Sequence, residues 1–168
     1  IRDAGFSDTG TPPPLNTGVL RSFVVDRGAG LLDFYYQLVS TSNPVEELFR
    51  IKSIGGFDPS LSLSVAQTSS LAGLVAGVGS GFVAGSYTQG AGLEDASTAD
   101  RDVGSAGSVG FDLSAPPAFF PDPENVQGGE SSTFLIVRTN STQYGDVTAQ
   151  ISGSGGTSLA STFAGNLT

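Results

Sequence analysis

The segment with residues 31–40, LLDFYYQLVS, alternates between large apolar and more polar side chains with a period of two. One face of an extended chain would carry Leu32, Phe34, Tyr36 and Leu38. The other face would carry Asp33, Tyr35 and Gln37. Such alternation in an aromatic-rich segment is typical of a half-buried β-strand. Because no other segment offers as much side-chain area to a core, we predict that it forms a central strand.

Further segments with the same alternation predict an all-β fold. They are residues 18–27, 47–54 (with Phe49 and Ile51 on one face), 60–66, 106–113, 132–139, 145–151 and 157–163. Two small-residue strands are predicted in residues 71–85. The total of about nine or ten short strands suits a single antiparallel β-sandwich of immunoglobulin-like or jelly-roll-like type.

Glycine and proline mark the connections between these strands. A short hairpin loop is predicted at residues 28–30, and a second one at residues 140–144. Residues 89–108 and 115–130 are expected to be long irregular connections. The domain prediction is an N-terminal arm with a proline spacer over residues 1–17 and a β-sandwich domain over residues 18–168.

The composition narrows the classes of function. The net charge of −9, with only seven Lys and Arg, argues against binding to nucleic acid or to an anionic membrane surface. Zero Cys excludes disulfides and thiol chemistry. The apolar residues 71–85 are too few for a membrane span, which needs roughly 20. The chain begins at Ile1 and contains no Met, so removal of a signal peptide or a boundary within a longer chain accounts for its start. We expect an extracellular or cell-surface location.

The sequence does not predict an enzyme. Without His or Cys, the usual nucleophile–base pairs and zinc sites are missing. A Ser–Lys pair would depend on Lys52, which is expected to point outward from a strand. The adjacent carboxylates of Glu46 and Glu47 would point to opposite faces of a strand, as would those of Glu94 and Asp95. No cofactor is predicted.

Calcium is the metal that the acidic connections would suit best, because it prefers several oxygen ligands. The candidate ligands are Asp95, Asp100 and Asp102, with Asp58, Asp122 and Glu124 as further acids in loops. None of them has the spacing of a known calcium loop. The alternative is that these acids are solvated, with Arg101 neutralising its neighbours.

Two further kinds of surface site are open to prediction. Asn140 and Asn166 each begin an Asn-X-Ser/Thr sequon and are candidates for glycosylation. A carbohydrate-binding surface would need aromatic platforms, and the chain has four tyrosines but no Trp. Those tyrosines are Tyr35, Tyr36, Tyr87 and Tyr144.

Several segments resemble the ectodomains of exported bacterial proteins that carry a PEP-CTERM sorting signal. They are LLDFYYQLVSTSNPVEELFRIKSIGGF (31–57), ADRDVGSAGSVGFDL (99–113), GESSTFLIVRTN (129–140) and STFA (161–164). The Pro-Glu-Pro motif, hydrophobic segment and basic tail of the sorting signal do not occur in residues 1–168. The resemblance implies export, residence at the cell surface or in the extracellular matrix, and no catalytic residues to assign.

These observations predict a structural protein whose partners are other copies of itself, and extracellular polysaccharide as a second kind of partner. The N-terminal arm is apolar at Ile1, Phe6 and Leu15 and is separated from the first strand by Pro12, Pro13 and Pro14. It could add to a sheet edge of a neighbouring copy and build a filament by strand exchange, as could the C-terminal strand. The alternative function is a carbohydrate-binding surface module.

Overall fold

The computed structural model places the chain in two packed β-sheets, as predicted for a β-sandwich. It describes residues 2–7, 16–41, 47–68, 93–94, 96–102, 107–113 and 125–166. Within these residues there are thirteen strands and no helix. The predicted strands at 71–85 lie outside the described residues.

The first sheet has seven strands and contains both the N-terminal strand and the aromatic segment. They are β1 (Arg2–Ser7), β2 (Thr17–Asp26), β3 (Leu32–Ser40), β5 (Leu63–Thr68), β6 (Leu93–Glu94), β10 (Ser131–Ser132) and β11 (Phe134–Thr139). The main order is β1-β2-β3-β11-β5, so β3 is central, as predicted. The short strands β10 and β6 extend the sheet beside the end of β3, and β6 pairs with β10 in parallel.

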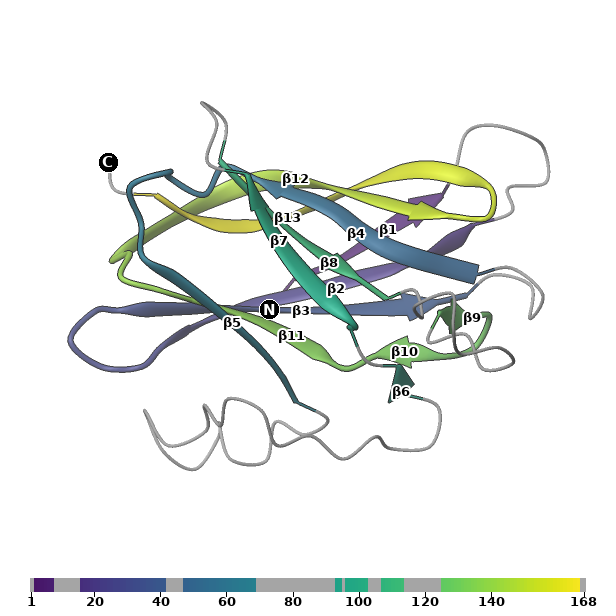
Figure 1. Ribbon diagram of the computed structural model, residues 1–168, viewed down its shortest axis with the longest axis horizontal. Helices are drawn as coiled ribbons and strands as arrows, with labels where there is room; N and C mark the ends of the chain where they lie inside the picture. Colours follow the sequence, from purple (N-terminus) through teal and green to yellow (C-terminus); the bar gives the residue numbers. More distant parts are fainter. Residues whose placement is uncertain are drawn as a thin grey trace.

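The second sheet has six strands in the main order β13-β12-β4-β8-β7, with β9 beside β4. They are β4 (Glu47–Gly55), β7 (Thr98–Asp102), β8 (Ser108–Asp112), β9 (Val126–Gln127), β12 (Gln143–Gly153) and β13 (Gly156–Asn166). In Figure 1, β12 and β4 run across the upper part of the molecule and β3 and β11 across the lower part. The two sheets enclose one apolar core.

The inward face of β3 supplies much of that core. Phe34, Tyr36 and Leu38 are fully buried, and the Tyr36 hydroxyl donates a 2.7 Å hydrogen bond to the Phe163 carbonyl of the opposite sheet. Each such side chain contributes about 1.5–3 kcal/mol through burial. The hydrogen bond lets a tyrosine occupy this apolar position without leaving its hydroxyl unsatisfied.

The prediction that β3 is only half-buried is wrong. Asp33 and Tyr35, on the outward face, are 2% and 1% exposed. Tyr35 stacks on Phe23 of β2 at a ring distance of 4.9 Å, and Phe134 of β11 lies edge-on to Phe23. A strand in the middle of a sheet is covered by long side chains of its neighbours, which its own alternation cannot reveal.

Two predicted connections are also corrected. Residues 140–144 do not form a hairpin loop, because β11 pairs with β3 and β5 whereas β12 pairs with β13 and β4. This segment therefore crosses from one sheet to the other. The predicted connection 89–108 contains the strand β7, which pairs with β8 over five positions. Its charged sequence, TADRD, suits an edge strand. It lacks the alternation of apolar residues by which the other strands were predicted.

Strand β4 departs from a period of two. Leu48, Ile51 and Ile54 are all fully buried although they are three residues apart. Register shifts in the pairing of β4 with both β12 and β8 explain this spacing, since each irregularity changes the face that the following residues present. The predicted shared face of Phe49 and Ile51 cannot be compared, as the Phe49 side chain is outside the described set. Lys52 is exposed, as predicted.

Candidate functional site

The acidic candidates do not come together as a metal site in the described part of the chain. There, no group of three or more His, Cys, Asp or Glu side chains could hold a metal ion. Asp100 and Asp102 lie on the edge strand β7, and Asp100 forms an ion pair with Arg50 of β4. Arg101, between them, donates hydrogen bonds to the carbonyls of Asp58 and Pro59. Asp95 lies outside the described residues, and calcium binding stays a prediction.

The tyrosines do not form a row of exposed platforms. Tyr35 and Tyr36 are buried, which corrects the prediction that either could stack on a sugar. Burial and the nearby Asp33 carboxylate raise the pKa of Tyr35 to about 12. Tyr144 is 53% exposed and lies edge-on to Phe163, while Tyr87 is outside the described residues.

Asp33 holds a buried ion cluster on the outward face of the first sheet. Its carboxylate lies 3.1 Å from Arg27 Nε and 3.0 Å from an Arg138 terminal nitrogen. Arg27 also donates a 2.7 Å hydrogen bond to the Thr139 carbonyl. The cluster ties β3 to β11 and to the turn after β2. We assign it a structural role, because the buried Asp33 carboxylate lies between two arginines at the centre of a sheet.

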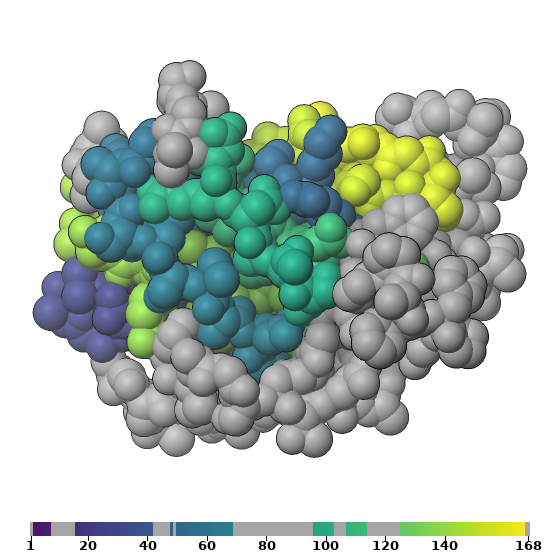
Figure 2. Space-filling model, in the orientation of Figure 1, coloured from purple at the N-terminus to yellow at the C-terminus, as the bar shows by residue number. Residues whose placement is uncertain are grey.

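In the described part of the chain, β5 is an edge of the first sheet and β7 is an edge of the second, and the two strands lie near each other (Figure 2). Two adjoining hollows there have volumes of about 290 and 180 Å³. We call them together the lateral groove. Its apolar lining includes Leu63, Val65, Ala96, Ala99, Phe111 and Leu135. No ionisable side chain lines the larger hollow, whereas Asp100 and Arg101 line the smaller one. The larger hollow therefore suits an apolar or extended peptide occupant better than a charged small molecule.

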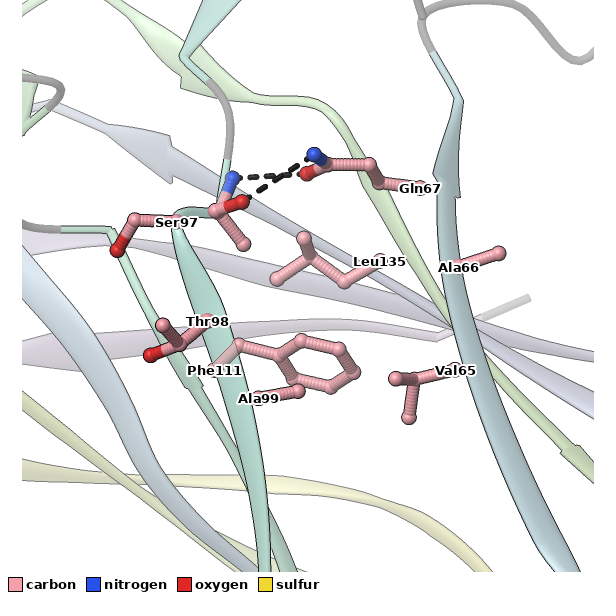
Figure 3. A pocket seen from close by; sticks show the side chains of 9 residues that line it. Val65, Ala66, Gln67, Ser97, Thr98, Ala99, Phe111 and Leu135 are labelled. Atoms are coloured by element: carbon pink, nitrogen blue, oxygen red, sulfur yellow. Dashed lines mark hydrogen bonds between the residues drawn. The ribbon is translucent and has the colours of Figure 1, made fainter. Parts of the chain in front are cut away.

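Val65 is exposed although its side chain points between the sheets. It pairs with Val137 of β11, a core residue, so its side chain points between the sheets. It is nevertheless 42% exposed. Figure 3 shows Val65 and Ala99 on opposite walls, with Phe111 and Leu135 between them. An inward-pointing valine with this exposure marks a place where a further strand or side chain could pack.

Gln67 closes one end of the lateral groove. Its side-chain amide accepts a 2.8 Å hydrogen bond from the Ala96 N–H and donates a 3.2 Å bond to the Ala96 carbonyl (Figure 3). These two bonds imitate the pairing of one strand with another. They link β5 to the start of β7 while leaving the rest of the groove open.

The edge strands differ in how they are protected against pairing with other chains. Within the described residues, β5 pairs with β11 alone, and its sequence LSVAQT contains no charge and no proline. By contrast, β7 carries three charged residues, all exposed. Charged side chains on an edge discourage pairing, whereas a neutral, regular edge permits it. The β5 edge is therefore suited to strand addition.

The arm residue Phe6 lies on β1, at the opposite edge of the first sheet. Strand β1 pairs with β2 of the same chain from Arg2 opposite Ser22 to Ser7 opposite Thr17. Phe6 is 6% exposed and packs over Gly18. Ile1 and Leu15, the other predicted arm residues, are outside the described residues. The sequence predicted an arm with apolar residues, but it did not predict that Phe6 packs against Gly18.

The two sequons differ in exposure. Asn140 is exposed, and its side-chain oxygen accepts a 2.9 Å hydrogen bond from the Ser62 N–H. Asn166 is partly buried at the end of β13. Asn140 is therefore the more accessible of the two candidates, and its modification stays a prediction.

No protein-family model, curated protein or solved structure matches this chain. Among the described residues, there is no helix of the length and apolar character required to cross a membrane. Any functional proposal therefore rests on the chain's own sequence and geometry.

Proposed function

We propose that this protein is an exported, non-catalytic structural protein of the cell surface or extracellular matrix, whose copies associate by β-strand pairing into filaments. The observation that carries the proposal is the neutral β5 edge beside the lateral groove, where inward-pointing Val65 is 42% exposed. A strand from a second copy added there would extend the first sheet and cover Val65. Location outside the cell rests on the resemblance of the sequence to exported ectodomains.

Charge limits where two copies could meet. Each copy carries a net charge of −9, so two copies repel each other over most orientations. Strand β5 carries no charge, which allows two copies to meet there without placing like charges opposite one another. The carbohydrate-binding alternative is not favoured, because Tyr35 and Tyr36 are buried.

The test is light scattering after size-exclusion chromatography, with negative-stain electron microscopy of the same fractions. Wild-type protein should form oligomers or filaments in a concentration-dependent manner. Val65→Lys should raise the concentration needed for assembly at least tenfold, because it places a charge in an apolar contact. Leu159→Lys is the matched control, since Leu159 is 60% exposed on β13 and lies outside the groove lining.

Monomeric wild-type protein at all concentrations would overturn the proposed function. Equal effects of the two lysine variants would instead show that added charge alone weakens assembly and that the β5 edge is not the contact.

A further inference from the structure

We propose that β1 is an exchangeable strand, and that the cleft between β2 and β13 accepts β1 from a second copy of this chain. The inference rests on the proposed self-association but uses a different surface, at the other edge of the first sheet. It names the segment that crosses between copies and the residues that receive it.

Strand β1 is attached through few buried side chains. Phe6 is the only buried residue among its six, and Ala4 is partly buried against the core. The C-terminal strand β13, in contrast, pairs with β12 over eleven positions and buries Ala160 and Ala164 in the core. Removing β13 would expose the core, whereas removing β1 exposes little of it. This difference favours β1 over the C-terminal strand as the exchanged segment.

The cleft is nevertheless shaped for β1. A Cβ atom at Gly18 would lie 2.6 Å from the Phe6 ring and 2.5 Å from the Val39 carbonyl oxygen, so only glycine fits beneath the phenylalanine. The Asp3 carboxylate receives two hydrogen bonds of 3.0 and 3.1 Å from the Arg21 guanidinium. These contacts fix both the register and the depth at which β1 sits.

Arg2 completes the attachment by reaching the second sheet. Its guanidinium lies 2.8 Å from an Asp146 carboxylate oxygen, donates a 3.3 Å hydrogen bond to the Thr162 carbonyl and stacks 4.2 Å above the Phe163 ring. The contacts named above join β1 to surfaces of β2, β12 and β13. None of them requires that β1 and β2 belong to the same copy.

The connector between β1 and β2 favours exchange. Ser7 and Thr17 lie opposite each other, so β1 and β2 of one copy run in opposite directions. That connector contains Pro12, Pro13 and Pro14, and a proline triplet prefers an extended conformation of about 3.1 Å per residue. Donating β1 to a neighbour removes the need for reversal and recreates identical contacts. Such exchange is a low-cost route to assembly.

The absence of cysteine from the chain allows a direct test. Asp3 and Arg21 are directly opposite each other, and opposite residues of an antiparallel pair have Cα atoms about 4.5–5.5 Å apart, within the disulfide range. In the double variant Asp3→Cys/Arg21→Cys, oxidation of the monomeric fraction should lock β1 in its own cleft. We expect the locked protein to assemble less than the reduced protein, because only association through the β5 edge remains open to it.

A mixture of the single variants identifies the strand that crosses. Asp3→Cys mixed with Arg21→Cys should give a covalent dimer of two copies on oxidation. Asp3→Cys mixed with Leu159→Cys, an exposed position outside the cleft, is the control for random collision and should give at most one-tenth of that product.

The outcomes separate the two proposals. Assembly of the oxidised double variant at the wild-type level, or a mixture that gives no more dimer than the control while the protein self-associates, would overturn strand exchange and leave the proposed function standing. Wild-type protein that never self-associates would overturn both.

Discussion

Truncation of Phe6 should release β1 selectively. The Phe6 side chain is 6% exposed and fills the hollow above Gly18. Buried Phe→Ala substitutions cost about 3–5 kcal/mol. Since Phe6 lies on an edge strand, we take the lower end of that range, about 3 kcal/mol. At 1.4 kcal/mol per tenfold change, this corresponds to a roughly 100-fold increase in the fraction of molecules with β1 undocked.

The measurement is native-state hydrogen exchange of the β2 amides that face β1. In Phe6→Ala they should exchange roughly 100-fold faster, while the β12–β13 hairpin keeps its protection. Phe23→Ala is the control, because Phe23 also lies on β2 but stacks on Tyr35 outside the β1 cleft. It should lower the overall stability without a selective change opposite β1. Equal loss of protection in both regions of Phe6→Ala would refute independent release of β1.

Three other substitutions test the fold itself. Asp33→Ala should lower the free energy of unfolding, measured by urea denaturation, by about 3–5 kcal/mol, because it leaves two arginines without their buried partner. The control Asp3→Ala, at an exposed position, should lower it far less. Equal losses in the two variants would contradict this account. The folded-state pKa of Tyr35 is raised from 10.0 to about 12, so its contribution to stability is complete below pH 10 and is lost as the pH rises towards 12. Unfolding midpoints of Tyr35→Phe should therefore fall less over that interval than those of wild type. Gly107→Ala should destabilise more than Gly129→Ala in thermal unfolding. Both glycines have positive φ, but of the two only Gly107 would place its Cβ against a backbone oxygen, that of Phe57.

Much of the fold could be predicted from local alternation. The period of two in residues 31–40 identified the central strand, and the glycines at 28–30 identified the β2–β3 turn, where Ala29 also has a positive φ of 57°. The alternation did not predict β7, whose charged residues face solvent on an edge. It also did not predict the irregularities of β4, because a bulge depends on the partner strand rather than on the strand's own side chains.

The candidate surfaces were harder to predict than the strands. The sequence identified Phe6 as an anchor because it is a large apolar residue in a polar arm. Its packing partner, Gly18, has no side chain from which the contact could be predicted. The lateral groove combines residues from four strands, such as Val65 and Phe111, which belong to different sheets. Each of them looks like an ordinary core residue in its own segment.

The sequence alone determined that the described part of this chain forms strands rather than helices, that the chain has no thiol or histidine chemistry, and that Phe6 precedes three consecutive prolines near the N-terminus. These properties follow from side-chain type and spacing over a few residues. Only the tertiary structure decided which strands share a sheet, that Tyr35 and Asp33 are buried, and that β5 and β7 leave a groove between them. Those properties depend on contacts between segments far apart in sequence. The hydrogen-bonding groups of one strand can pair equally well with several other strands, and the packing of the two sheets selects one of them.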